Sequence, residues 1–185
     1  MRSSGVLMHL SSLPSPYGIG TMGKQAKQFV DFLEKAGQTY WQMLPICPTS
    51  YGDSPYQSPS GFAGNPYFID LDILCTKKLL KKSECKSYQW NEKDDTVDYA
   101  LLYKNRYDLL RKAKVRFFEN VPQEYGQFCE KEADWLDDFA LFMALKEAHN
   151  GAQWSEWERP LKFREAEAIA KAKDTYADEI DFWKM

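Results

Sequence analysis

The N-terminal third of the chain alternates short apolar runs with one amphipathic segment. The run GVLMHL at 5–10 is unbroken, as in strands that are covered on both faces. Apolar residues recur at helical spacing over 24–36, and Gly37 suits the left-handed position that follows a helix end. The stretch TYWQMLPI at 39–46 is apolar and β-prone up to its proline. We therefore predict strands at 5–10 and 40–45, parallel and joined by a helix through a right-handed crossover.

Beyond about residue 75 the pattern becomes helical and stays so to the last residue. The spacing of apolar residues predicts a helix from Tyr99 to about Phe117, ended by Pro122. The next helix includes Trp135 and stops near Gly151.

Three other segments are less regular. YFIDLDIL at 67–74 is either strand-like or irregular, and WSEWERPLKFR at 154–164 is predicted to be a loop. The alanine-rich stretch from Glu165 to about Asp178 is predicted to be helical.

The stretch YGDSPYQSPSGFAGNP directly follows the second predicted strand and combines turn-forming residues with aromatic rings. In parallel α/β folds, loops after the C-terminal ends of strands gather at one face, so the 11–22 and 47–66 loops should emerge together. Tyr51 and Tyr56 can present ring faces there and Ser54 a hydroxyl, a combination that suits the apolar face and hydroxyl edge of a sugar. In the alternative, the tyrosines of the loop pack on their own helix, and residue chemistry alone does not separate the two interpretations.

Composition and charge narrow the function classes. The formal net charge is -3 with mixed signs, whereas a nucleic-acid-binding face needs clustered Lys and Arg. The basic stretch at 77–86 is interpreted as a solvated helix face. No apolar run approaches the roughly 20 residues of a membrane span, and the run at 5–10 is too short for a signal-peptide core. We therefore expect a cytoplasmic protein without nucleic-acid or membrane partners.

The sequence carries no pattern of metal or cofactor binding. Cys47, Cys75, Cys85 and Cys129 include no C-x-x-C pair, which argues against zinc and thioredoxin-type sites and for reduced thiols. His9 has no Ser or Cys nucleophile motif beside it and is interpreted as a packing or hydrogen-bonding residue. Since G-x-G-x-x-G, Walker and H-E-x-x-H patterns are also missing, we predict no metal and no cofactor.

Three stretches resemble one enzyme family. They are GVLMHLSSLPSPYGIGTMG, AGQTYWQMLPICPTSYGDSPYQSPSGFAGNPYFIDLD and WLDDFALFMALKE. They are similar to the 4-α-glucanotransferases of glycoside hydrolase family 77, which include amylomaltase and disproportionating enzyme. The resemblance runs over nearly the whole chain and is densest at 4–73.

The resemblance implies a (β/α)8 barrel with inserted helical subdomains and a retaining transfer of α-1,4-glucan segments to glucose or a maltodextrin. It implies that Tyr56, with Ser54 beside it, lies near the sugar whose bond is cut, and that Tyr51 serves a neighbouring glucan contact. Asp53 is a further candidate, although an Asp before a turn is commonly a backbone cap. A tyrosine in the 99–103 region should also touch glucan, and the choice between its two tyrosines stays open.

Retaining glycoside chemistry needs two carboxylates about 5 to 5.5 Å apart, and the sequence offers no such pair. Most acidic residues lie on helical segments as solvated groups, and Asp70 and Asp72 are interpreted as structural. In the family the catalytic carboxylates lie on later barrel strands, and a complete barrel takes roughly 250 residues. We therefore predict an α/β fragment without catalytic residues: the first two β/α units of an incomplete TIM barrel at 1–75 and a mainly helical inserted subdomain at 76–185.

Two alternatives remain beside this prediction. A self-standing, non-catalytic glucan-binding or interaction module would keep the same loop, and an unrelated α/β domain would share it by accident. Under the first prediction the partners are α-1,4-glucans, maltodextrins and glucose. An unclosed barrel would leave an apolar strand edge unpaired and so favour self-association.

Overall fold

The computed structural model describes residues 2–93 and 95–185. Packing divides it into two compact units, Met1–Glu119 and Asn120–Met185. Each unit has its own cluster of buried hydrophobic residues. This division does not test the predicted boundary at residue 75, which separates barrel-forming residues from inserted ones.

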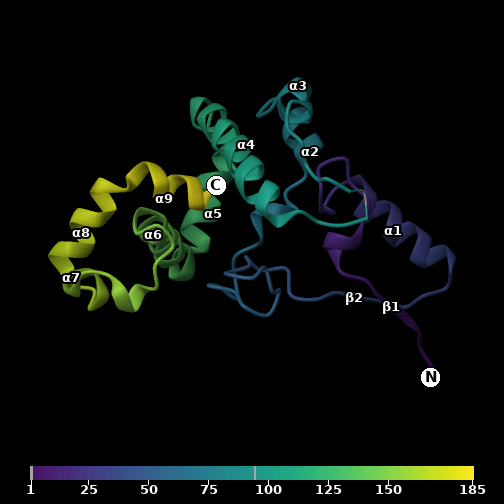
Figure 1. Ribbon diagram of the computed structural model, residues 1–185, viewed down its shortest axis with the longest axis horizontal. Helices are drawn as coiled ribbons and strands as arrows, with labels where there is room; N and C mark the ends of the chain where they lie inside the picture. Colours follow the sequence, from purple (N-terminus) through teal and green to yellow (C-terminus); the bar gives the residue numbers. More distant parts are fainter. Residues whose placement is uncertain (1, 94) are drawn as a thin grey trace. The chain divides into compact units, whose positions relative to one another are not determined.

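A pair of parallel strands opens the first unit. β1 (Gly5–Leu7) pairs with β2 (Tyr40–Gln42), with Gly5 opposite Tyr40. α1 (Lys24–Lys35) connects the two strands (Figure 1). The prediction of adjacent parallel strands joined by a helix is therefore confirmed.

Both strands are shorter than the sequence predicts, with three residues each instead of the spans 5–10 and 40–45. The Met8 N–H still donates to the Gln42 carbonyl over 3.0 Å. The chain then turns into a 3-10 helix, η1 (Leu10–Ser12), which places Leu10 in the hydrophobic core. The apolar run is thus divided between the strand and the core, which explains why it extends past the end of the strand.

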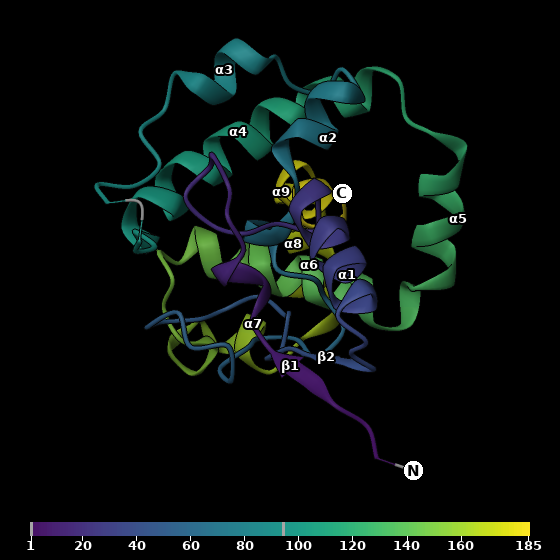
Figure 2. The ribbon, with the colours of Figure 1, turned by 90° about the vertical axis from the view of Figure 1, so that its right-hand side faces the viewer.

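α1 packs on one side of the strand pair through aromatic residues (Figure 2). The ring of Phe29 meets that of Trp41 edge to face, with centroids 4.9 Å apart. The Trp41 indole N–H donates to the Met8 carbonyl over 2.8 Å, which fastens the end of β1 to β2. Leu33 of α1 is buried, whereas Val30 of the same helix is half exposed.

The remaining elements of the first unit are helical: η2 (Pro66–Phe68), α2 (Leu71–Thr76), α3 (Lys82–Lys86) and α4 (Tyr99–Glu119). The helix predicted over 99–117 is confirmed. The strand-like interpretation of 67–74 is wrong, because this segment forms η2 and the start of α2. The cause is Asp70, whose Oδ1 accepts a hydrogen bond from the Ile73 N–H over 2.9 Å and caps α2.

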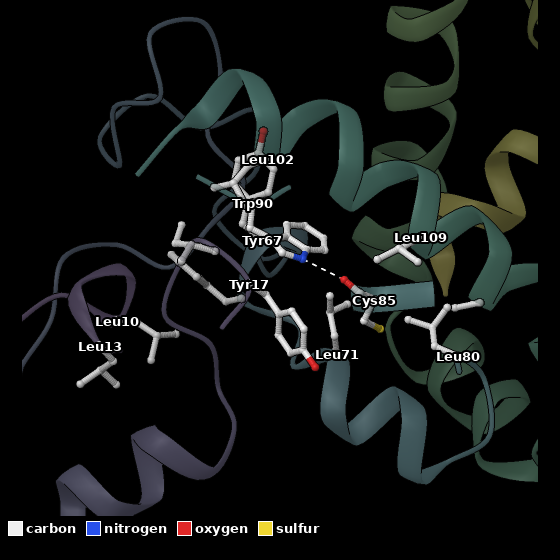
Figure 3. Packing of buried hydrophobic residues seen from close by; sticks show 13 residues of the cluster. Leu10, Leu13, Tyr17, Tyr67, Leu71, Leu80, Cys85, Trp90, Leu102 and Leu109 are labelled. Carbon is white, nitrogen blue, oxygen red and sulfur yellow. Dashed lines mark hydrogen bonds between the residues drawn. The ribbon is translucent and has the colours of Figure 1, made fainter. Parts of the chain in front are cut away.

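The buried core of the first unit is formed by loops and helices (Figure 3), and Trp41 of β2 packs against it. Its buried members are Leu10, Leu13, Tyr17, Ile19, Tyr67, Phe68, Leu71, Leu80, Cys85, Trp90, Leu102, Leu109 and Ala113. The residues of β1 and β2 are exposed or half-buried. The segments that follow the strands therefore provide more of the core than the strands do.

The second unit is helical, with α5 (Gln123–Lys131), α6 (Ala133–Ala148), η3 (Trp154–Glu156), α7 (Arg159–Lys162), α8 (Ala166–Thr175) and α9 (Ala177–Lys184). Its core joins Leu141 and Leu145 of α6 to Trp157 and Ala172. The segment 154–164, predicted as a loop, contains the short helices η3 and α7. Proline in the first turn of α7 favours a helix start, a signal that the sequence prediction did not use.

Candidate functional site

The 47–66 loop is closed at its base by backbone contacts. The Asn65 N–H donates to the Ile46 carbonyl over 3.0 Å, which joins the two ends of the loop. The Asn65 side-chain oxygen accepts from the Tyr67 N–H over 2.9 Å, and Asn65 itself is buried. Ala63 and Pro48, near the two ends of the loop, are also buried. The loop therefore stands on a fixed base formed by the FAGNP stretch.

Tight turns shape the tip of the loop. The Asp53 N–H donates to Ser50 O and the Gln57 N–H to Ser54 O, both over 3.1 Å. The Ser50 N–H donates back to Gln57 O over 3.0 Å. Gly52 has φ +84° and Asp53 φ 53°, so two successive residues adopt the left-handed conformation. This turn accounts for the glycine followed by aspartate, residue types that tolerate positive φ.

The aromatic rings of the loop point away from the protein. Tyr51 is 96% exposed and Tyr56 is 73% exposed. Exposed rings of this size offer flat apolar faces to a ligand. The alternative in which these two tyrosines pack on their own helix does not agree with their exposure.

The other two predicted contact residues also have structural roles. Ser54 is half-buried, and its Oγ accepts a hydrogen bond from the Tyr56 N–H over 3.3 Å, which orients the residue that carries the ring. Asp53 is half-buried, and its Oδ1 accepts from the Thr49 hydroxyl over 3.4 Å. Burial raises the pKa of the Asp53 carboxyl, against the opposing effect of the Thr49 hydroxyl. The loop thus places Asp53, Ser54 and Tyr56 together, and whether they contact a glucan stays a prediction.

A group of tyrosines lies at the start of α4. The Tyr67 ring contacts those of Tyr99 and Tyr107, with centroids 6.2 and 6.0 Å away, and Tyr103 contacts Tyr107 at 5.3 Å. Tyr67 is buried and Tyr99 half-buried, whereas Tyr103 is exposed. Burial raises the pKa of Tyr99, and the charge of Asp53 raises it further, so the 47–66 loop lies close to this group.

The buried arginine of the first unit was not identified as a functional residue from the sequence. Arg106 has no exposed surface, and its Nη2 donates to the Tyr67 carbonyl over 2.6 Å. Its guanidinium carbon lies 5.6 Å from the centre of the Trp90 ring. Burial lowers the pKa of Arg106 to about 10, so the group keeps its charge at neutral pH. The only sequence signal was an arginine within the apolar stripe of α4.

The 11–22 loop joins the segment that follows the 47–66 loop. The Thr21 hydroxyl donates to Asp70 Oδ2 over 2.6 Å, and both residues are buried. The Met22 N–H donates to the Phe68 carbonyl over 2.9 Å. A Cβ atom on Gly23 would lie 1.8 Å from Asp70 Oδ2, so glycine is required for this approach. The chain segments that follow β1 and β2 are therefore tied together, in agreement with the placement of both loops at one face.

The acidic residues near this loop have structural partners. Asp70 caps α2, and Asp72 accepts hydrogen bonds from Tyr17 and Lys82. In the second unit, Asp138 pairs with Arg164.

Within residues 2–93 and 95–185, no group of three or more His, Cys, Asp and Glu side chains is arranged to hold a metal ion. Of the helices that the structure describes, none is long and apolar enough to cross a membrane.

Comparisons with known proteins point to one family. The family model described as 4-alpha-glucanotransferase matches residues 8–185. A 4-alpha-glucanotransferase of Clostridium butyricum is 49% identical over 178 residues, covering 96% of this chain and 37% of that protein. The enzyme of the same name from Thermus thermophilus is 46% identical over 185 residues, covering 98% of this chain and 36% of that protein.

A solved structure agrees with these matches. The amylomaltase from Streptococcus agalactiae in complex with acarbose superposes with a TM-score of 0.96 at 39% identity. The superposition covers all of this chain and 38% of that one. The chain therefore spans little more than a third of the length of the relatives it matches.

Proposed function

Because the chain belongs to the 4-alpha-glucanotransferase family, we propose that it is the N-terminal, substrate-contacting part of an enzyme that transfers α-1,4-glucan segments between maltodextrins or to glucose. The observation that carries the proposal is the 47–66 loop, a family signature whose tyrosine rings are exposed on a fixed base. The relative from Streptococcus agalactiae was solved with acarbose, which supports a glucan-like ligand for this chain as well.

In this proposal the chain forms the first two β/α units of a (β/α)8 barrel and a helical insertion, with residues 1–75 in the barrel. The parallel pair of β1 and β2 around α1 supports that arrangement. The nucleophile and the acid/base carboxylate would lie in the part of the relatives that the chain does not span, because retaining transfer needs a close pair of carboxylates. A cytoplasmic location remains a prediction from the sequence.

Each residue of the site has a proposed role. Tyr56 stacks on the sugar next to the cleaved bond, and Ser54 holds the backbone of Tyr56 while its hydroxyl faces the same sugar. Tyr51 stacks on a neighbouring glucose unit, and Asp53 accepts hydrogen bonds from sugar hydroxyls. Of the two tyrosines at the start of α4, Tyr103 is the better candidate for a further glucan contact because its ring is exposed.

The test joins this chain to the remaining part of the Clostridium butyricum relative and follows disproportionation of maltotriose. We expect Tyr56→Ala to lower the transfer rate at least about tenfold, because it removes both contact area and sugar orientation. Tyr88→Ala, outside the loop, is the control and should change the rate far less. A Tyr56 variant as fast as the unchanged enzyme would make the loop merely structural.

Assays of the purified chain alone distinguish an enzyme fragment from a glucan-binding module. We expect the purified chain to convert no maltotriose, because ring and hydroxyl contacts cannot replace positioned carboxylates, and to bind maltodextrins weakly or not at all. Titration with maltoheptaose, followed by tryptophan fluorescence, measures the second point. Tight binding that Tyr51→Ala and Tyr56→Ala weaken would favour the module, and transfer by the chain alone would overturn the fragment assignment.

A further inference from the structure

Two cysteine thiols of the first unit lie close together although they belong to different helices. Cys75 is in the last turn of α2, and Cys85 is in α3, ten residues further along the chain. Their sulfur atoms are 3.7 Å apart, and both thiols are free. Neither cysteine belongs to the 47–66 loop or to its proposed ligand contacts.

The surroundings hold α3, and with it Cys85, in place. Cys85 has no exposed surface, and its carbonyl accepts a hydrogen bond from the Trp90 indole N–H over 2.9 Å (Figure 3). Arg116 binds Glu84 through both terminal nitrogens, at 2.8 and 2.6 Å, which fastens α3 to α4. The thiol of Cys85 therefore keeps its position relative to the core.

Two features keep Cys75 near Cys85 while leaving it room to move. Lys82 of α3 pairs with Asp72 of α2, so the two helices are already held side by side. Cys75 is half-buried, and α2 ends just after it in a turn where Lys78 has φ 62°. Since a disulfide bond is about 2.05 Å long, the sulfurs would need to approach by roughly 1.7 Å. A shift of this size is within reach of a side-chain rotation and a small movement of the last turn of α2.

We propose that Cys75 and Cys85 are a site of reversible oxidation at which a hydroperoxide forms an intramolecular disulfide. In the first step the Cys75 sulfur takes an oxygen atom from the hydroperoxide, which breaks the O–O bond and yields a sulfenic acid and water or an alcohol. In the second step the Cys85 sulfur attacks the Cys75 sulfur, and the hydroxyl leaves as water with the proton of Cys85. The two sulfurs together lose two electrons, which reduce the hydroperoxide.

The order of the two steps follows from exposure. Cys75 is the thiol that solvent reaches, whereas burial, and then the nearby Cys75 thiol, raise the pKa of the Cys85 thiol to about 12. A buried thiol reacts poorly with a dissolved oxidant, but beside a sulfenic acid it can pass its proton to the leaving hydroxyl and attack the neighbouring sulfur as a thiolate. Cys75 is therefore the reactive thiol and Cys85 the resolving thiol.

The disulfide would reinforce the support of the loops. It closes a short loop between α2 and α3, and α2 is capped by Asp70, which binds Thr21 of the 11–22 loop. A cross-link at this point restricts the unfolded chain, and we expect the melting temperature to rise by about 5 °C on oxidation.

The experiment treats the full chain with hydrogen peroxide, alkylates the remaining thiols and digests the product with trypsin. Lysines at 77, 78, 81 and 82 separate the two cysteines, so a disulfide appears as two joined peptides in mass spectrometry. We expect a protein two hydrogens lighter, with Cys47 and Cys129 alkylated, and dithiothreitol should restore four alkylatable thiols. Four alkylated thiols after peroxide, over-oxidised Cys75 without a link, or links through Cys47 or Cys129 would overturn the proposal.

Variants identify the role of each sulfur. Cys75→Ser should abolish both the joined peptides and the peroxide-dependent rise in melting temperature, and Cys47→Ser is the matched control that should keep both. In Cys85→Ala the sulfenic acid on Cys75 should persist and be trapped by dimedone. If Cys85→Ala does not fold, the comparison of Cys75→Ser with Cys47→Ser still tests the proposal. A rise in the melting temperature of Cys75→Ser with peroxide would contradict it.

Discussion

The 11–22 loop that follows β1, and the segment that follows the 47–66 loop, are better buried than the strands β1 and β2. Tyr17, Thr21 and Tyr67 are buried and connected to helices of the first unit. On the strands, Leu7 is 61% exposed and Tyr40 62% exposed. Parallel strands in proteins are normally covered on both faces. The comparison shows that these two segments take their shape from a core built with α2, α3 and α4 more than from the sheet.

The largest expected effect on stability comes from comparing a leucine of the buried core with a leucine of the exposed strand β1. Leu102→Ala should lower the free energy of unfolding by about 2 to 5 kcal/mol, because Leu102 is fully buried and its loss leaves a cavity. Leu7→Ala, on the exposed strand, should cost less than about 1 kcal/mol. Urea denaturation followed by tryptophan fluorescence measures both. Equal losses of free energy would show that the strands contribute as much to stability as the buried core of the first unit.

The next effect concerns the contact between the two loop segments. Gly23→Ala should lower the free energy of unfolding by about 2 kcal/mol, because the new methyl group displaces the Asp70 carboxylate from Thr21 and from the start of α2. Gly64→Ala is the matched control, since a Cβ there meets nothing within 4 Å, and should stay within about 0.5 kcal/mol. The same denaturation assay applies, and a Gly23 variant as stable as the control would remove this contact from the support of the loops.

A smaller effect depends on pH. The hydrogen bonds from Arg116, and then that from the Lys81 N–H, lower the pKa of Glu84 from its ordinary value of 4.5 to about 2. The folded-state pKa is depressed, so the contribution to stability is full above pH 4.5 and is lost as the pH falls towards 2. Glu84→Gln should therefore cost about 1 kcal/mol at pH 7 and progressively less below pH 4.5. A difference from the unchanged protein that is constant from pH 7 to 3 would contradict this account.

The smallest effect on stability is expected on the strand side, where association should change instead. Leu7→Lys should leave the free energy of unfolding within about 0.5 kcal/mol, because the side chain is exposed. A charge on an open strand disfavours pairing with another chain, so the variant should elute more as a monomer from a sizing column. Arg2→Lys, which adds no charge, is the control. An unchanged elution profile at high protein concentration would show that the strand edges do not drive association.

The sequence predicts well those features that depend on neighbouring residues. Helical spacing over 24–36 and the apolar runs on either side suffice for β1, α1 and β2, because each pattern lies within its own element. The turn at Gly52 and Asp53 follows from residue types that accept positive φ. The signature of the 47–66 loop likewise points to the family without any structure.

Features that depend on distant residues could not be predicted. The segment 67–74 alternates like a strand, and only the capping role of Asp70, supported by Thr21 far along the chain, shows that a helix begins there. The burial of Arg106 depends on the carbonyl of Tyr67, 39 residues away. The exposure of Tyr51 and Tyr56 also depends on how the loop is held, which residue chemistry alone left open.

The position of the first unit's buried core within the chain has a consequence for the order of folding. Its buried residues run from Leu10 to Ala113, and its long-range bonds, such as those of Thr21 with Asp70 and Tyr67 with Arg106, close within that span. During synthesis this core can therefore form as soon as α4 has left the ribosome. In the longer relatives, the loops would then take their shape before the later part of the chain arrives, and the strands would be completed afterwards.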